Sequence, residues 1–251
     1  MDAVVVAYAD VRFREDAELL AAHVGAPVAD AAEVEASQLA LHVGADGLSL
    51  TRDGMALAGD FTRMLPRLKQ GALQRELLVK AARIKGVERP VAVDATAGLG
   101  EDSLLLAAAG FEVTLCESDP VIAALLADAC RRAEADARLA PIVARMHVVE
   151  RDSCAVLANL AAAPDVVYLD PMFPGRTKSA AVKKKFQLIH GLEHPCDANA
   201  ERELMEAAMA AGPRKIVVKR PVKGPHLAGV KPSHSVGGKA VRYDCIVLPR
   251  G

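Results

Sequence analysis

The chain has 251 residues, of which 52% are apolar and 25% charged, and its formal net charge is −1. These values suit one large globular domain with at most a small appendage, and they confine any nucleic-acid site to a local basic patch. Its five cysteines are scattered without a Cys-x-x-Cys pair, and no apolar stretch reaches about 18 residues, so we expect no disulfide framework, no metal and no membrane span. The first residues lack a signal-peptide pattern, which predicts a cytoplasmic protein.

Residues 1–60 predict a small N-terminal α+β subdomain. Val4–Tyr8 has the pattern of a strand and Glu15–Val24 that of a helix. Leu39–Val43 and Leu48–Thr51 flank an Asp-Gly turn, which is typical of a β-hairpin. No motif with chemistry stands out in this part of the chain.

Residues 61–89 predict a basic helical linker. Leu73 to Ile84 shows helical periodicity. The positive side chains of the segment are Arg63, Arg67, Lys69, Arg75, Lys80, Arg83 and Lys85. A solvated face of an amphipathic helix is the commoner explanation of such charges, and a surface that meets phosphates is the alternative.

Residues 90–251 alternate between strand and helix patterns. The predicted strands are Val91–Asp94, Val113–Glu117, Met146–Val149, Val166–Leu169, Lys215–Lys219 and Ala240–Leu248. The predicted helices are Glu101–Ala109, Pro120–Ala137, Cys154–Leu160 and Glu201–Ala210. Alternating βα units of this length predict an α/β domain with a doubly wound, mostly parallel sheet of Rossmann-like type.

A glycine-containing loop follows the first strand of this domain. After Asp94, Gly98 and Gly100 permit a tight turn and a close approach of the backbone to a ligand. Glu117 ends the second strand, where a carboxylate can accept both hydroxyls of a ribose. The pattern fits a dinucleotide or S-adenosylmethionine, and a purely structural turn is the alternative.

Three details favour S-adenosylmethionine. Ser103 stands where the third glycine of a dinucleotide fingerprint would fall. Glu101 and Asp102 add negative charge that suits a sulfonium and an amino group and repels a pyrophosphate. Asp152-Ser153, directly after the third strand, supplies a carboxylate for an adenine amine.

The fourth strand ends in Asp170-Pro171-Met172-Phe173, which resembles the Asp/Asn-Pro-Pro-aromatic motif of methyltransferases acting on exocyclic amines. The Asp170 carboxylate and the Pro171 carbonyl would accept the hydrogens of such an amine and point its lone pair at the methyl group. Phe173 would stack on the base. Met172 departs from the double-proline pattern. A turn role for Asp170 and a core role for Phe173 are the alternatives.

Positive side chains follow the fourth and fifth strands. Lys178, Lys183 and Lys184 come after the first of these, and Lys219-Arg220 after the second. Because parallel strands end at the same edge of a sheet, we expect these residues to form a local RNA-binding patch beside the base pocket. For Lys183 and Lys184 alone, a solvated helix face is the alternative.

Several of these stretches together resemble the ribosomal RNA small subunit methyltransferase J family. They are Asp94–Gly100 with Asp102, Asp170–Pro174, Lys178–Lys184 and Val217–Pro221. The resemblance implies a class I methyltransferase fold and N2-methylation of one guanosine in 16S rRNA, free or in the small ribosomal subunit, with S-adenosylmethionine as donor. It implies cofactor contacts from Glu101-Asp102, Glu117-Ser118, Asp152-Ser153 and Asp170. Glu101 departs from the arginine that family members carry there.

Two other functions fit the same residues. One is amine methylation of another substrate, DNA adenine or a protein, in the same pocket. The other is a non-catalytic RNA-binding module that keeps a relic of the cofactor fold.

Overall fold

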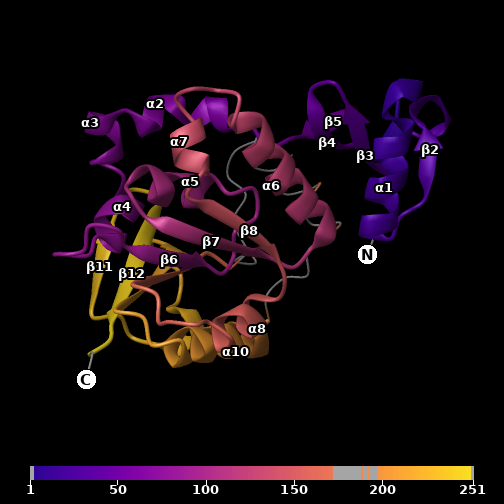
Figure 1. Cartoon of the computed structure of the whole chain (residues 1–251). Coiled ribbons are helices and arrows are strands. Elements are labelled where there is room, and N and C mark those ends of the chain that lie inside the picture. Colours follow the sequence, from indigo (N-terminus) through magenta and orange to yellow (C-terminus); the bar gives the residue numbers. More distant parts are fainter. Residues whose placement is uncertain (1–2, 172–187, 189–191, 193–196, 250–251) are drawn as a thin grey trace.

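The computed structural model of the chain describes residues 3–171, 188, 192 and 197–249. Within them the strands form two sheets, one of five strands near the N-terminus and one of seven strands. Figure 1 shows the small N-terminal sheet beside the larger body that holds the rest of the chain. No helix in these ranges is long and apolar enough to cross a membrane.

The small sheet has the strand order β2-β1-β3-β4-β5. Its elements are β1 (Val4–Tyr8), α1 (Arg14–Val24), β2 (Val28–Asp30), β3 (Leu39–Gly44), β4 (Gly47–Arg52) and β5 (Met55–Leu57). β1 is parallel to β2 and β3, whereas β3, β4 and β5 are antiparallel. The predicted strand, helix and hairpin are confirmed. β2 was not predicted because it has only three residues and lies at the sheet edge.

The large sheet has the order β11-β12-β10-β9-β6-β7-β8. Its strands are β6 (Val91–Asp94), β7 (Glu112–Glu117), β8 (Met146–Glu150), β9 (Val166–Leu169), β10 (Lys215–Pro221), β11 (His234–Gly237) and β12 (Val241–Val247). β6 to β10 are parallel, and β12 and β11 complete the sheet in antiparallel pairs. This order confirms the predicted mostly parallel, doubly wound sheet. Only β11 went unpredicted, because its His-Ser-Val-Gly sequence has no apolar alternation.

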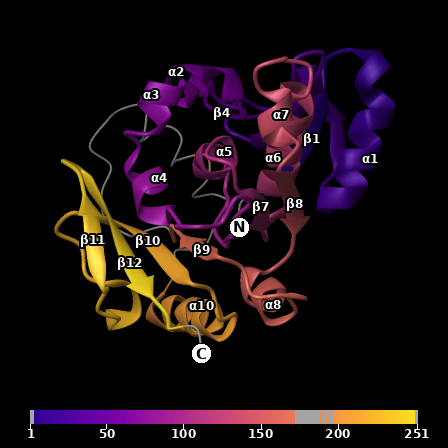
Figure 2. The same ribbon diagram turned by 60° about the vertical axis from the view of Figure 1, so that its left-hand side comes forward.

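Helices cover both faces of the large sheet. They are α5 (Glu101–Ala108), α6 (Pro120–Ala133), α7 (Ala140–Val143), α8 (Ser153–Ala158) and α10 (Ala198–Ala210). Figures 1 and 2 both show α5, α6 and α7 on one side and α8 and α10 on the other. Side chains alternate accordingly along β9, where Tyr168 packs toward α5 while Val167 and Leu169 pack toward α10.

The segment predicted as a basic linker packs into the core of the large sheet. It contains a 3-10 turn (Phe61–Met64), α2 (Leu65–Leu68), α3 (Gln70–Leu73) and α4 (Leu77–Ala82). Phe61, Leu73 and Leu78 are buried in the same cluster as the apolar residues of α5. The helical periodicity of Leu73–Ile84 is interrupted at Glu76, whose backbone is extended and whose side chain binds Arg67.

The small sheet is joined to the large one through α6. Apolar side chains of α6, among them Ile122 and Leu125, pack in one cluster with Leu41 and Leu50 of the small sheet. Asp128 of α6 accepts a hydrogen bond of 3.0 Å from the backbone N–H of Leu48 at the start of β4. The two sheets therefore share both apolar and polar contacts across one helix.

Candidate active site

A cavity of about 510 Å³ opens at the carboxyl ends of the parallel strands. The chain runs from β6 outward through β7 to β8 and then returns to the other side of β6 with β9, so the strand order reverses there. Open α/β sheets bind ligands at such a reversal. The lining comes from the ends of β6, β7, β8 and β9 and from α10: Ala95, Thr96, Gly98, Cys116–Pro120, Arg151–Cys154, Pro171, Leu192, Ala200, Glu203 and Leu204.

The loop between β6 and α5 depends on its two glycines. Gly98 and Gly100 have φ values of +53° and +76°, in the left-handed region that favours glycine. A Cβ on Gly100 would also lie 2.6 Å from Leu126 of α6. The loop thus passes close under α6, and Gly98 brings its backbone N–H to 3.1 Å from the Glu117 carboxylate.

Glu117 ends β7 as a buried carboxylate on the cavity wall. It accepts hydrogen bonds from the backbone N–H groups of Gly98 and Asp119, one on each oxygen. Burial raises the pKa of Glu117, and these backbone donors oppose that shift. Because a carboxylate oxygen has two lone pairs, each oxygen keeps the capacity to accept one further hydroxyl.

Asp152 follows β8, where it caps a helix and lines the cavity. Its Oδ1 accepts the backbone N–H of Ala155 at 2.9 Å and caps α8. The residue also lines the cavity, as does the neighbouring Ser153. Glu203 and Leu204 of α10 face them from the opposite wall and were not predicted, because nothing in the sequence places α10 beside this loop.

The cavity fits S-adenosylmethionine. Its volume lies in the range of about 300–1,000 Å³ typical of small-molecule sites. The carboxylates of Glu117 and Asp152 suit hydroxyl and amine donors, while Leu192 and Leu204 offer apolar surface to a flat ring. The same carboxylates would repel the phosphates of a dinucleotide. Glu117, Ser118, Asp152 and Ser153 all lie on the walls of this cavity.

Asp94 lies beneath the loop and does not line the cavity. Its carboxyl group accepts hydrogen bonds from the Ser103 hydroxyl at 2.5 Å and the Thr96 backbone N–H at 3.1 Å. Burial raises the pKa of Asp94 to about 7, against the lowering effect of these donors. Asp94 is therefore a structural group under the cofactor loop, and its charge at neutral pH is only partial.

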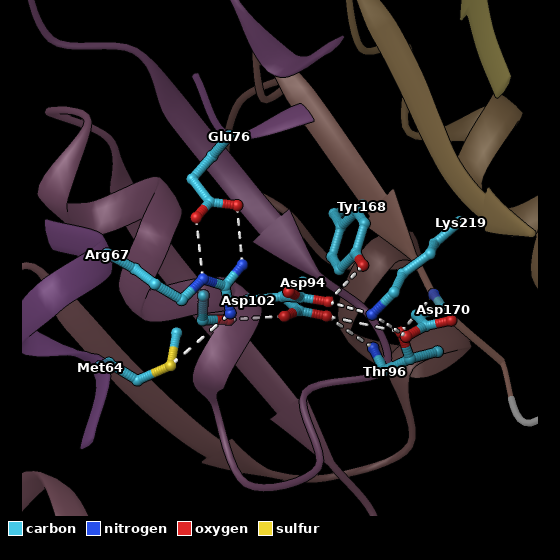
Figure 3. Close-up of polar contacts among 10 residues, drawn as sticks. Met64, Arg67, Glu76, Asp94, Thr96, Asp102, Tyr168, Asp170 and Lys219 are labelled. Atoms are coloured by element: carbon cyan, nitrogen blue, oxygen red, sulfur yellow. Dashed lines mark hydrogen bonds and ion pairs between the residues drawn. The ribbon is translucent and has the colours of Figure 1, made fainter. Parts of the chain in front are cut away.

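Asp170 belongs to a polar cluster on the α5 side of the sheet (Figure 3). Lys219 at the end of β10 lies 2.8 Å from the Asp170 carboxylate and 2.7 Å from that of Asp102 in α5. Tyr168 donates its hydroxyl to Asp102 at 2.6 Å. The Thr96 hydroxyl accepts the backbone N–H of Asp170 at 2.7 Å. The cluster fixes Asp170 through both its backbone and its side chain.

The pKa values of the two carboxylates in this cluster are shifted in opposite directions. Burial raises the pKa of Asp170, and the nearby Lys219 opposes this shift without cancelling it. Burial also works against ionisation of Asp102, but Lys219 and the Tyr168 hydroxyl together hold its pKa below the usual value. Asp102 is thus the firmly ionised partner of Lys219.

Apart from Lys219 and Arg220, the predicted site residues fall into three groups. Gly98, Glu117-Ser118, Asp152-Ser153 and Pro171 line the cavity. Asp94, Gly100, Glu101, Asp102 and Asp170 lie around it without lining it. Phe173, Lys178, Lys183 and Lys184 lie outside the described residues.

Arg220 requires a correction. Its side chain is 1% exposed, donates to the backbone carbonyl of Pro225 at 3.0 Å and lies 3.2 Å from the Glu201 carboxylate. A guanidinium enclosed in this way cannot reach a phosphate, so the structure corrects the prediction that Arg220 contacts RNA. Lys219 likewise points into the cluster rather than outward.

Thr96 and Tyr168 are site residues that sequence reasoning missed. Thr96 sits in the cofactor loop, and its contact with Asp170 joins the ends of β6 and β9. Tyr168 precedes Asp170 by two residues on one strand, so both point to the same face of the sheet. The sequence shows that spacing, but it does not show that the Tyr168 hydroxyl donates to Asp102.

The seven-stranded sheet and the carboxylate-lined cavity at its point of reversal define a class I S-adenosylmethionine-dependent methyltransferase. Residues 28–248 match the family model described as "Putative SAM-dependent methyltransferase". A crystal structure of a SAM-dependent methyltransferase from Neisseria gonorrhoeae is similar with a TM-score of 0.76 and 29% identity, over 97% of this chain and 95% of that one.

Curated relatives are similar along nearly the whole chain. The ribosomal RNA small subunit methyltransferase J of Thioalkalivibrio sulfidiphilus is 45% identical over 96% of both chains. That of Pseudomonas aeruginosa strain LESB58 is 42% identical over 92% of this chain and 89% of its own. The chain belongs to the ribosomal RNA small subunit methyltransferase J family.

Proposed function

We propose that this protein transfers a methyl group from S-adenosylmethionine to the exocyclic N2 of a guanosine in 16S rRNA. The names of its relatives support a small-subunit rRNA substrate. The motif Asp170-Pro171 supports an amine as the reacting group. Such a reaction takes place in the cytoplasm, where rRNA and the small ribosomal subunit are found.

The observation that carries the proposal is the position of Asp170 between the cavity and the solvent. Pro171 lines the cavity, while the adjoining Asp170 side chain remains 36% exposed. A base entering from solvent would therefore meet Asp170 at the edge of the cofactor cavity. S-adenosylmethionine, when bound, supplies an electrophilic methyl group on a sulfonium that leaves without acid assistance.

The protein's own contribution is positioning. The lone pair of an exocyclic amine is delocalised into the base, so the amine is a weak nucleophile. The Asp170 carboxylate and the Pro171 carbonyl accept hydrogen bonds from the two N–H groups of the amine. These hydrogen bonds direct the lone pair out of the base plane. Phe173 stacks on the base, and Lys178, Lys183 and Lys184 meet the RNA backbone.

Methylation of rRNA is tested with the purified chain, labelled S-adenosylmethionine, and both rRNA and small subunits from a strain lacking this enzyme. We expect label in RNA and N2-methylguanosine on mass analysis of the nucleosides. Label in DNA adenine or in protein would support the alternative amine substrates. Tight binding of S-adenosylmethionine without label in any of these substrates would contradict the proposal and favour a non-catalytic RNA-binding module.

Asp170→Ala should remove methyl transfer while S-adenosylmethionine binding stays intact. Loss of the group that orients the amine is expected to lower kcat about 100-fold or more. The matched control is Asp165→Asn, at the opposite end of the same strand, where the carboxylate binds the Val91 backbone N–H far from the cavity. Near-normal kcat in Asp170→Ala would remove this residue from the mechanism.

A further inference from the structure

Lys219 and Asp170 are brought together by the register of two neighbouring strands. Val218 of β10 pairs with Leu169 of β9 in parallel, so the next residues, Lys219 and Asp170, lie side by side where β9 ends and β10 continues to Pro221. Side chains alternate along a strand, and Lys219 therefore shares with Asp170 and Tyr168 the face that α5 covers. This placement is a property of the sheet and does not depend on a surface loop.

The contacts of the Lys219 ammonium join two carboxylates from different elements. Its Nζ lies 2.7 Å from Oδ2 of Asp102 and 2.8 Å from Oδ2 of Asp170, and the side chain is 26% exposed. Asp102 is itself held by the Tyr168 hydroxyl. An ammonium with two carboxylate partners on one side is poorly placed to release them for an RNA phosphate.

We infer that Lys219 is a positioning residue that holds the Asp170 carboxylate for the incoming amine, with Asp102 as its fixed anchor. Lys219 holds Oδ2 of Asp170, and no hydrogen bond from the described residues reaches Oδ1. Oδ1 is the oxygen left to accept a hydrogen of the base. This inference rests on the proposed function. It reassigns Lys219, which the charge pattern predicted to bind RNA, and Asp102, which the family resemblance predicted to contact the cofactor.

The same contact favours the ionised form of Asp170. Burial and the charge of Asp102 both raise the pKa of Asp170, and Lys219 is the largest influence in the opposite direction. Without Lys219, the two carboxylates would face each other with only the weaker influence of Arg67 on Asp102 and of Arg220 on Asp170 to offset their charges. Protonation of Asp170 would then remove the acceptor that the amine requires.

The test compares Lys219→Met with Lys219→Arg and the wild type in the rRNA methylation assay. We expect Lys219→Met to lower kcat about 100-fold, with KM for RNA and Kd for S-adenosylmethionine within about threefold of wild type. The acidic limb of its kcat–pH profile should move to higher pH, because Asp170 protonates more readily. Lys219→Arg keeps the charge and should recover part of kcat.

Lys215→Met is the matched control. Lys215 lies at the other end of β10, is half-buried, and donates to the backbone carbonyls of Ala81 and Arg83 at 2.8 and 3.0 Å. Its removal also takes a partly buried ammonium from the same strand. We expect kcat per folded enzyme and the pH profile to match wild type.

A measurement independent of activity follows the Asp170 carboxyl carbon by NMR during a pH titration, with Asp170→Ala identifying the signal. The Asp170 pKa should rise in Lys219→Met. In Asp102→Asn it should fall, because the repelling charge is gone and Lys219 is left to Asp170 alone. Opposite shifts in two variants cannot come from general loosening of the site. Asp102→Asn also serves if Lys219→Met does not fold.

The outcomes separate this inference from the proposed function. Absence of methylation by the wild type would overturn the proposed function, while the NMR titration would still test the contact between Lys219 and Asp170. An active wild type with normal kcat and an unchanged Asp170 pKa in Lys219→Met would overturn the positioning role. A raised KM for RNA with unchanged kcat in Lys219→Met would also overturn the positioning role. It would indicate that Lys219 binds RNA instead.

Discussion

Asp94 makes the stability of this protein depend on pH. Its carboxyl group is enclosed under the cofactor loop, and burial raises its pKa to about 7. A carboxyl whose pKa is raised on folding binds its proton more tightly in the folded state. Its contribution to stability is therefore complete below the unfolded pKa and is lost as the pH rises through about 7.

Asp94→Asn should flatten this dependence. Between about pH 5 and pH 8 the free energy of unfolding of the wild type should fall, relative to the variant, by roughly 2–3 kcal/mol. Urea unfolding of the wild type and the variant at the two pH values measures this difference. Asp136→Asn is the control, because Arg138 holds the pKa of Asp136 at about 2, below the tested range. Parallel slopes for wild type and Asp94→Asn would show that Asp94 does not titrate in this window.

At the scale of elements, the loop from β6 to α5 combines two glycines with different constraints. Both have positive φ, but open space surrounds the Cβ position of Gly98. At Gly100 the Cβ would lie 2.6 Å from Leu126 and 3.3 Å from Phe61. Gly100 is therefore constrained by packing as well as by backbone conformation, and this packing links the cofactor loop to α6.

Gly100→Ala should destabilise the protein more than Gly98→Ala. We expect a loss of about 1–2 kcal/mol for Gly98→Ala, from the left-handed backbone alone. For Gly100→Ala we expect about 2–4 kcal/mol, because Leu126 and Phe61 must also move within a packed core. Urea unfolding at one pH compares them. Equal losses in the free energy of unfolding would mean that the Leu126 side chain moves aside without destabilising the core.

At the scale of the whole molecule, a buried carboxylate adds polar contacts to the apolar cluster that joins the two sheets. Asp128 of α6 has a side chain that is 5% exposed and binds both Arg131 and Arg132. It also accepts the Leu48 backbone N–H of the small sheet, while Arg132 donates to the Gly59 carbonyl beyond β5. Without Asp128, the part-buried Leu48 N–H and the Arg132 guanidinium would each lose a hydrogen-bond acceptor.

Asp128→Ala should weaken the attachment of the small sheet without weakening the binding of S-adenosylmethionine. Removing the acceptor of a part-buried backbone N–H costs about 1–3 kcal/mol. We expect a lower Tm and faster protease cleavage within residues 1–60, with an unchanged Kd for S-adenosylmethionine. The control is Arg131→Ala, whose side chain is 68% exposed and should cost less than about 1 kcal/mol. Unchanged proteolysis would show that apolar contacts alone hold the sheet.

The sequence by itself determined the α/β order of the large domain and several of the residues that line its cavity. Short apolar runs that stop before a proline, such as Val166–Leu169, predict buried strands, and the residues that end parallel strands meet at one edge of the sheet. Gly98, Glu117 and Asp152 follow from this rule, because each is local to the end of one strand. The same rule placed Asp170 and Pro171 beside them.

The tertiary structure alone decided how side chains from different strands are paired. Lys219 and Arg220 are adjacent in the sequence and equally basic, yet one points to Asp170 and the other into a closed pocket with Glu201. Their opposite orientations follow from the register of β10 and from the helices that cover each face. A positive charge indicates that a partner is needed, but only the packed sheet determines whether that partner is a carboxylate or RNA.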